Sequence, residues 1–295
     1  MNSKRSIRAL TLTAAVGLTF TAQARAQQVV AVLSSKRGAY LEAFSAFTAA
    51  YGAKVPSYDL SAEKPGFGKD TRIVVAFGGK ASAFGYPADV LLIYCLAPGF
   101  SLNDATGGDR AVKISMVPDP DFLLSTIKII QPAIRSLGVF WLSPWYSNIV
   151  REFKAAGDRS GIEVKAFQLE KLDTLPSLLR SEISKLDAFW VPPDPQLMNQ
   201  DTMQQLTDFS WDNGIAFYGS ARSLAKGGAV ASLGLSFAES GRAAAKAALD
   251  ALGGRVVQKV IYSSSTELSL NFDGAKKCGI TLPPETVKEA AYAFP

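Results

Sequence analysis

Few side chains of this sequence could activate a nucleophile or hold a metal ion. The 295 residues include no histidine, so the usual general base and the commonest metal ligand are both missing. The two cysteines, Cys95 and Cys278, therefore have no histidine to activate them. A short Ser-x-x-Lys pattern occurs at 61–64, 125–128 and 223–226, without the companion motifs of acylating enzymes. Because Gly-x-Ser-x-Gly and any acidic or cysteine cluster with metal spacing are also missing, the sequence predicts a protein that is not an enzyme and has no metal and no cofactor.

The residues best suited to bind a small molecule follow apolar runs of the chain. In open α/β sheets, ligands bind beyond the carboxyl ends of the strands. The helix that follows each strand begins with free backbone N–H groups, which favour an anion. Hydroxyls and glycine amides are suitable contacts there, and aromatic rings could stack on a ligand. The predicted ligand-binding residues are Ser34, Ser35, Tyr40, Gly78, Gly79, Ser143, Trp145, Tyr146, Asp194 and Ser220.

Each of these residues also has a purely structural interpretation. Serines cap helices, glycines allow tight turns, and the aromatic rings could pack within a lobe. Asp194 either holds a substrate ammonium group or caps the helix that follows it. The sequence leaves both interpretations open.

The apolar runs indicate the elements that would position these residues. Val29–Leu33, Ile73–Phe77 and Val90–Leu96 are unbroken apolar runs, typical of strands buried on both faces of a parallel sheet. Helical spacing separates them, and the pattern restarts at Leu137–Leu142. This alternation predicts an α/β fold with two doubly wound parallel-sheet lobes.

The first residues predict export. Lys4, Arg5 and Arg8 precede the apolar run 9–21, and Ala24-Arg25-Ala26 provides the small residues that a signal peptidase recognises. We therefore expect a signal peptide over residues 1–26, a mature chain that begins at Gln27, and a periplasmic location. The alternative is an uncleaved N-terminal anchor, but the apolar run is shorter than the roughly 20 residues that span a membrane.

The charge of the mature chain argues against a nucleic-acid partner. Four of the 31 basic residues lie in the leader, which leaves 27 basic against 26 acidic residues. A nucleic-acid-binding protein would need a basic face. No later apolar stretch is long enough to span a membrane, and Cys95 and Cys278 could be either bridged or free.

Several stretches together resemble a known family. They are Ile73–Gly78, Asp187–Asp194, Lys226–Gly234, the Ala-rich helix from Gly241, and the tail from Asn271 to Pro283. They resemble the substrate-binding proteins of ABC transporters with the type 1 periplasmic fold, in the subfamily whose best-known members bind aromatic amino acids. The segment between Tyr58 and Arg72 departs from this pattern, because it contains Pro65-Gly66-Phe67-Gly68 where relatives usually have a full helix.

The resemblance implies two lobes joined by a multi-strand hinge, with a small-molecule ligand between them. Pro118-Asp119-Pro120 marks the first boundary, and the resemblance places a return crossing after Ser236. We therefore expect a first lobe of residues 27–118 plus 236–256 and a second of 119–235 plus 257–295. The implied protein is a monomer that delivers its ligand, possibly amino-acid-like in the sense of carrying a carboxylate and an ammonium, to an ABC permease and ATPase of the inner membrane. The alternative is a periplasmic sensory or accessory module that signals to a receptor.

Overall fold

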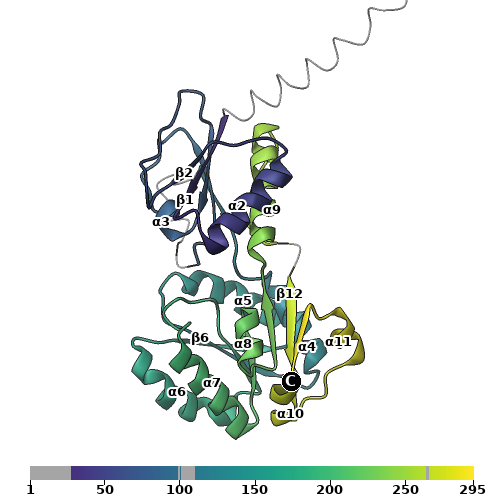
Figure 1. Cartoon of the computed structure of the whole chain (residues 1–295). Helices are drawn as coiled ribbons and strands as arrows, with labels where there is room; N and C mark the ends of the chain where they lie inside the picture. Colours follow the sequence, from purple (N-terminus) through teal and green to yellow (C-terminus); the bar gives the residue numbers. More distant parts are fainter. Residues whose placement is uncertain (1–27, 99, 101–109, 264–265) are drawn as a thin grey trace, which may run out of the picture.

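The computed structural model describes residues 28–98, 100, 110–263 and 266–295. The predicted signal peptide, residues 1–26, lies outside these residues. Two sheets, each covered by helices, form two lobes that lie one above the other in Figure 1. The predicted α/β fold with two parallel-sheet lobes is confirmed.

The first lobe is built on a six-stranded sheet in the order β11-β5-β4-β3-β1-β2. All its strand pairs are parallel. Every side chain of β1 and β3 is buried, which explains their unbroken apolar sequences. The strands are β1 (Val29–Leu33), β2 (Ser57–Asp59), β3 (Ile73–Phe77), β4 (Leu91–Cys95), β5 (Ala111–Ile114) and β11 (Val260–Ile261).

Helices α2 (Gly38–Tyr51) and α9 (Phe237–Leu252) share one apolar cluster with this sheet, and α3 (Gly79–Ser82) belongs to the cluster on the opposite face. Between β2 and β3, the segment 60–72 forms turns and no helix, as its Pro-Gly content predicts. Phe67 instead packs edge-on against Tyr86, with ring centroids 5.6 Å apart, and so helps to cover the sheet.

The second lobe is built on a seven-stranded sheet in the order β13-β12-β10-β9-β8-β6-β7. Only the β10–β12 pair is antiparallel among the pairs described. The strands are β6 (Ser136–Trp141), β7 (Glu163–Gln168), β8 (Ala188–Trp190), β9 (Ala216–Gly219), β10 (Ala231–Gly234), β12 (Glu267–Asn271) and β13 (Tyr292–Phe294). The helices are α4 (Pro120–Ile130), α5 (Tyr146–Ser160), α6 (Leu175–Glu182), α7 (Gln200–Asn213), α8 (Arg222–Lys226), α10 (Phe272–Lys277) and α11 (Pro284–Glu289).

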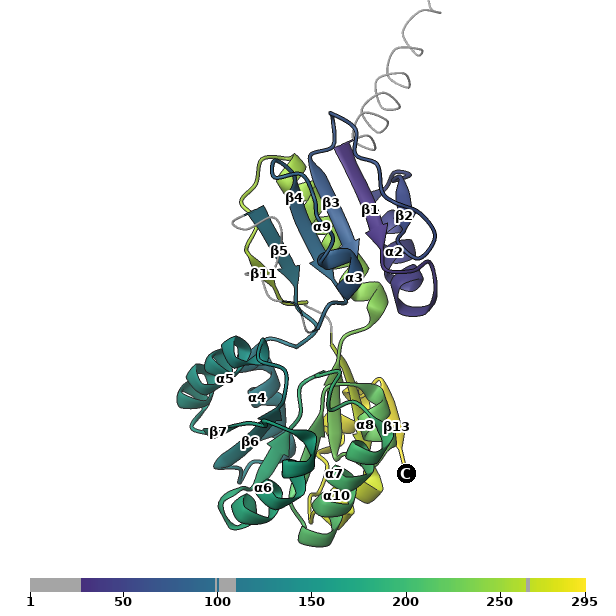
Figure 2. The same cartoon turned by 90° about the vertical axis from the view of Figure 1, so that its left-hand side faces the viewer.

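The chain passes between the lobes after β5, after β10 and after β11, as Figure 2 shows from the side. The last crossing differs from the expected boundary at residue 256. Val260 pairs with Lys113 and Ile261 with Ile114, so this apolar pair adds an edge strand to the first sheet. The second lobe therefore resumes beyond residue 261.

The state of the two cysteines and the character of the helices also bear on function. Cys95 is buried on β4 of the first lobe and Cys278 follows α10 of the second, and both are free thiols. Burial raises the pKa of the Cys95 thiol, which keeps it protonated and unreactive. Within the described residues, no helix combines the length and apolar character needed to cross a membrane.

The contact between α2 and α9 depends on one glycine. A Cβ on Gly241 would lie 2.0 Å from the carbonyl oxygen of Ala43, which is backbone and cannot rotate away. The buried alanines Ala244, Ala245 and Ala248 continue the same close approach along α9. Small side chains on this face therefore set the distance between the two helices.

We predict that Gly241→Ala destabilises the first lobe, because the added methyl group must push α9 away from α2. Overpacking of this kind costs about 2 kcal/mol, which lowers the melting temperature by roughly 4–8 °C. Thermal unfolding followed by circular dichroism measures the change. Gly85→Ala is the matched control, since its added Cβ meets no atom within 4 Å. A Gly241→Ala protein that melts with the wild type would contradict the proposed contact.

Candidate functional site between the lobes

The carboxyl ends of β1 and β3 bring three predicted site residues together in the first lobe. A Cβ on Gly78 would lie 2.5 Å from the ring of Tyr40 and 2.6 Å from the hydroxyl oxygen of Ser34. Gly78 also has φ of 99°, a conformation that favours glycine. Tyr40 and Ser34 therefore close over a position that only glycine can occupy.

Ser35 and Gly79, the other two predicted residues of this lobe, directly follow Ser34 and Gly78 in the sequence. The Ser34 hydroxyl accepts a hydrogen bond of 3.0 Å from the backbone N–H of Ala81, so it stabilises the start of α3. Ser35 is half-buried, and a Cβ on Gly79 would meet nothing within 4 Å. Space is thus present at Gly79, whereas Ser34 already has a structural partner.

In the second lobe, Asp194 lies in the loop after strand β8, and its carboxylate is fully buried. Its Oδ2 accepts hydrogen bonds from the backbone N–H groups of Leu142 and Ser143, at 2.8 and 2.7 Å. Its Oδ1 accepts from the Ser143 hydroxyl at 2.5 Å and from the Gln196 N–H at 3.1 Å. A carboxylate has about four acceptor positions, so these bonds use its capacity. Asp194 ties the end of β6 to the loop after β8 and presents no lone pair to a ligand ammonium.

Two neighbouring aromatic residues have opposite environments. Tyr146 is 3% exposed, and its hydroxyl donates a 2.6 Å hydrogen bond to the carbonyl of Pro193. Burial, and then the nearby Asp194 charge, raises the pKa of Tyr146. Trp145 is 40% exposed and lies at the start of α5. Of the two rings, Trp145 is the one that offers a surface to a ligand.

Ser220, the last predicted residue, follows β9. Its hydroxyl is buried and has no hydrogen-bond partner among the described residues. It lines neither of the cavities described below. Ser143 and Ser220 therefore belong to the interior of the strand-end loops.

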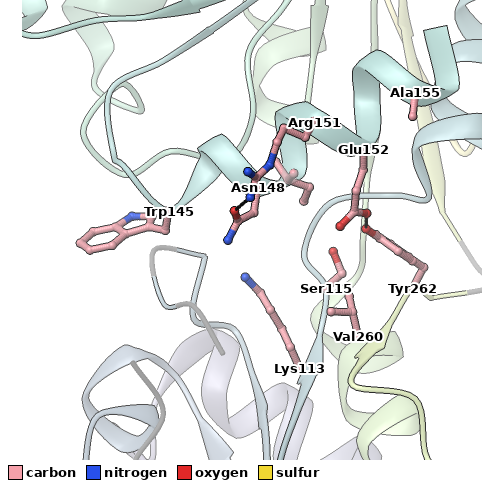
Figure 3. A pocket seen from close by; sticks show the side chains of 10 residues that line it. Lys113, Ser115, Trp145, Asn148, Arg151, Glu152, Ala155, Val260 and Tyr262 are labelled. Carbon is pink, nitrogen blue, oxygen red and sulfur yellow. Dashed lines mark hydrogen bonds between the residues drawn. The ribbon is translucent and has the colours of Figure 1, made fainter. Parts of the chain in front are cut away.

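A cavity of about 610 Å³ lies between strands β5 and β11 of the first lobe and helix α5 of the second. We call β5 and β11 the hinge strands, because the chain passes to the second lobe after each of them. Figure 3 shows Lys113 and Ser115 on one side and Trp145 and Asn148 on the other. A smaller recess that contains Pro98 shares Lys113, Ser115, Trp145 and Ile149 with it, so the two spaces are continuous. The lining residues of the larger cavity are Lys113, Ser115, Trp145, Asn148, Ile149, Arg151, Glu152, Ala155, Val260 and Tyr262.

Sequence reasoning found only Trp145 in the larger cavity and missed its charged residues. Asn148, Glu152 and Ala155 follow Trp145 at helical spacing, so they form one face of α5. Lys113 interrupts an otherwise apolar strand, between the buried residues Val112 and Ile114. That interruption is a sequence signal that could have pointed to the site.

A hydrogen bond joins the two sides of the cavity. The hydroxyl of Tyr262, the residue after β11, donates to the carboxylate of Glu152 on α5. Burial and this bond raise the pKa of Tyr262, so its hydroxyl stays protonated and remains a donor. No group of three or more acidic or cysteine residues within the described chain could hold a metal ion.

A family model described as ABC transporter substrate binding protein matches residues 121–293. The chain belongs to this family. The matched residues cover the second lobe and also α9 and β11, which return to the first. The predicted family is therefore confirmed. Proteins of this family bind solutes and are not enzymes, as the sequence predicts.

Solved structures of other proteins share this fold. The L-Trp complex of an ABC domain from Streptococcus pneumonia is 19% identical, covers 90% of this chain and 100% of its own, and has a TM-score of 0.59. A ligand-free, open substrate-binding protein with adhesive properties from Clostridium difficile is 16% identical, covers 90% of this chain and 98% of its own, and has a TM-score of 0.64. No curated protein matches the chain. At these identities the substrate-binding protein shares a fold with its neighbours, and its ligand must be argued from its own residues.

We predict that Asp194→Asn destabilises this substrate-binding protein. The amide nitrogen of asparagine cannot accept the hydrogen bonds that the lost oxygen accepted, and hydrogen bonds to a charged group contribute about 1.5–3 kcal/mol. The free energy of unfolding, measured by urea titration, should fall by at least about 2 kcal/mol. Asp212→Asn, an exposed substitution in the same lobe, serves as the control. Unchanged stability combined with lost ligand affinity would instead restore the ammonium-binding interpretation.

Proposed function

We propose that the chain is an exported solute-binding protein that encloses one small organic molecule between its lobes and delivers it to an ABC permease and its ATPase. The observation that carries this proposal is the cavity of about 610 Å³ whose walls come from both lobes. A ligand in such a cavity contacts both lobes at once. It therefore binds more tightly to a closed arrangement, and ligand binding shifts the lobes toward closure.

The proposed ligand has an anionic group and an apolar body, as an aromatic amino acid has, and Asp194 does not serve as a partner for an ammonium group. Trp145 supports this class, because an exposed indole at a cavity wall covers apolar surface. The neighbour from Streptococcus pneumonia that holds L-Trp belongs to the same fold, and we extend its ligand class to this chain as part of the proposal.

We further propose that lobe closure brings the strand ends of the first lobe against the ligand. Gly79, Ser35 and Tyr40 lie at those ends and would contribute contacts, with Ser34 and Gly78 shaping the loop. In the second lobe Trp145 is the contact residue. Asp194, Ser143, Tyr146 and Ser220 act by positioning the loops.

Export completes the proposal. The basic start, the short apolar run and Ala24-Arg25-Ala26 support removal of residues 1–26 and release of the mature chain into the periplasm. Such a location is the one in which a binding protein meets both its solute and the outer face of its permease.

We predict that native mass spectrometry of the exported protein gives the mass of residues 27–295 plus one small molecule, or gains one after incubation with a metabolite extract. The leader motif sets the expected mass, and the two-lobed cavity sets the one-to-one ratio. Deleting the gene that encodes this chain should then abolish uptake of the identified molecule by the cell. A retained leader would contradict export, and a protein that gains no molecule would contradict solute binding.

We predict that Trp145→Ala weakens binding of the molecule so identified by roughly thirtyfold, because loss of an aromatic anchor costs about 2 kcal/mol. The melting temperature should barely change, since the ring is largely outside the core. Calorimetric titration and thermal melts provide the two readings, and Tyr40→Ala should act in the same direction on affinity. Phe272→Ala, an exposed ring on α10, is the control. A lower melting temperature with intact affinity would show that Trp145 only packs the lobe.

A further inference from the structure

Charged side chains line the cavity from both lobes. Those among the described residues are Lys113, Arg151 and Glu152. The Glu152 carboxylate accepts a hydrogen bond from Tyr262, which directs it to the hinge. Lys113 comes from β5 of the first lobe and Arg151 from α5 of the second. The two cations thus face the cavity from opposite lobes.

Arg151 is held in place by a neighbour on its own helix and has no acidic partner among the described residues. Its Nη2 donates a hydrogen bond to the side-chain oxygen of Asn148, one turn earlier on α5. No salt bridge joins Arg151 to a carboxylate in the described part of the chain, whereas Arg159 on the same helix pairs with Asp121 at 2.7 Å. A guanidinium presents its N–H donors as a planar fork that matches the two oxygens of a carboxylate. Asn148 therefore holds a group with the shape and charge to receive one.

Lys113 is directed toward the same space. Leu96 adopts φ of 55° after β4, a left-handed conformation that is uncommon outside glycine. This bend leads to Phe100, whose carbonyl accepts a 3.0 Å hydrogen bond from the Lys113 ammonium. Figure 3 shows the Lys113 side chain reaching from the hinge strand toward Asn148 on α5.

We infer that Arg151 and Lys113 together bind the anionic group of the ligand, so that the solute is a small carboxylate with an apolar or aromatic body. This inference rests on the proposed function. Two cations on opposite lobes repel each other as the lobes approach, and a carboxylate between them replaces that repulsion with two attractions. Trp145 and Ile149 beside them cover the apolar body. Recognition of the charge is thereby coupled to closure.

The test uses pairs of probes in which a carboxamide of similar shape replaces the carboxylate. L-tryptophan, L-phenylalanine, indole-3-acetate and phenylacetate are compared with their neutral-headed amides by thermal shift and calorimetric titration. The wild-type protein should bind one or more of the acids and bind the matching amide at least tenfold more weakly. Arg151→Met and Lys113→Met should each weaken binding of the acid by about 10- to 100-fold, the range expected for a hydrogen-bonded charged group.

Arg180→Met and Lys54→Met are the matched controls, because both residues are exposed and neither lines the cavity. The ligand-free melting temperatures of all variants show whether each one folds. Equal affinity for acids and amides, or wild-type affinity in a folded Arg151→Met protein, would overturn the inference while leaving solute binding intact. Failure of the wild type to bind any of the acids would overturn it as well, and native mass spectrometry then tells separately whether a neutral solute is bound.

Discussion

The interleaving of the chain between the two lobes is the constraint on which the rest of the structure depends. The first sheet is complete only after α9 and β11 return to it, and the second only after β12 and β13 follow. Side-chain caps mark two of the crossings, with Asp119 capping α4 and Ser236 capping α9. Each of these two helices therefore has a defined start directly after the connection that leads into it. The chain thus connects the lobes after β5, after β10 and after β11.

The strand ends of this fold must serve two purposes that compete for the same polar groups. A strand-end loop buries backbone N–H groups, and these need acceptors. Asp194 meets that need for Leu142 and Ser143, as Ser34 does for Ala81. Polar groups used in this way are not available to a solute. The cavity is lined instead by residues one position or one helical turn further on, such as Trp145 and Asn148.

This division explains which features could be predicted from the sequence. The strands β1 and β3 agree with the predicted runs Val29–Leu33 and Ile73–Phe77, because burial on both faces leaves an unbroken apolar sequence. The role of Asp194 could not be predicted, since its donors lie about 50 residues away and meet it only in the folded chain. The polar face of α5 resembles any solvent-exposed helix face, and only the position of β5 and β11 opposite it makes a cavity wall. The residue types can be read from the sequence, whereas the contacts between segments far apart in the chain cannot.

In the proposed function, the energetics of closure favour a cavity with both a charged and an apolar side. Shifting a two-state equilibrium from 1:99 to 99:1 takes a differential binding free energy of about 5.5 kcal/mol. Hydrogen bonds to a charged group contribute about 1.5–3 kcal/mol, and a well-buried aromatic anchor contributes about 2 kcal/mol or more. Neither contribution reaches the required size alone, whereas together they supply about 3.5–5 kcal/mol and approach it. A solute that satisfies only Arg151 and Lys113, or only Trp145, would therefore leave much of the protein open. In the proposed function, discrimination between solutes follows from completion of closure, because only a molecule that engages both sides stabilises the closed form.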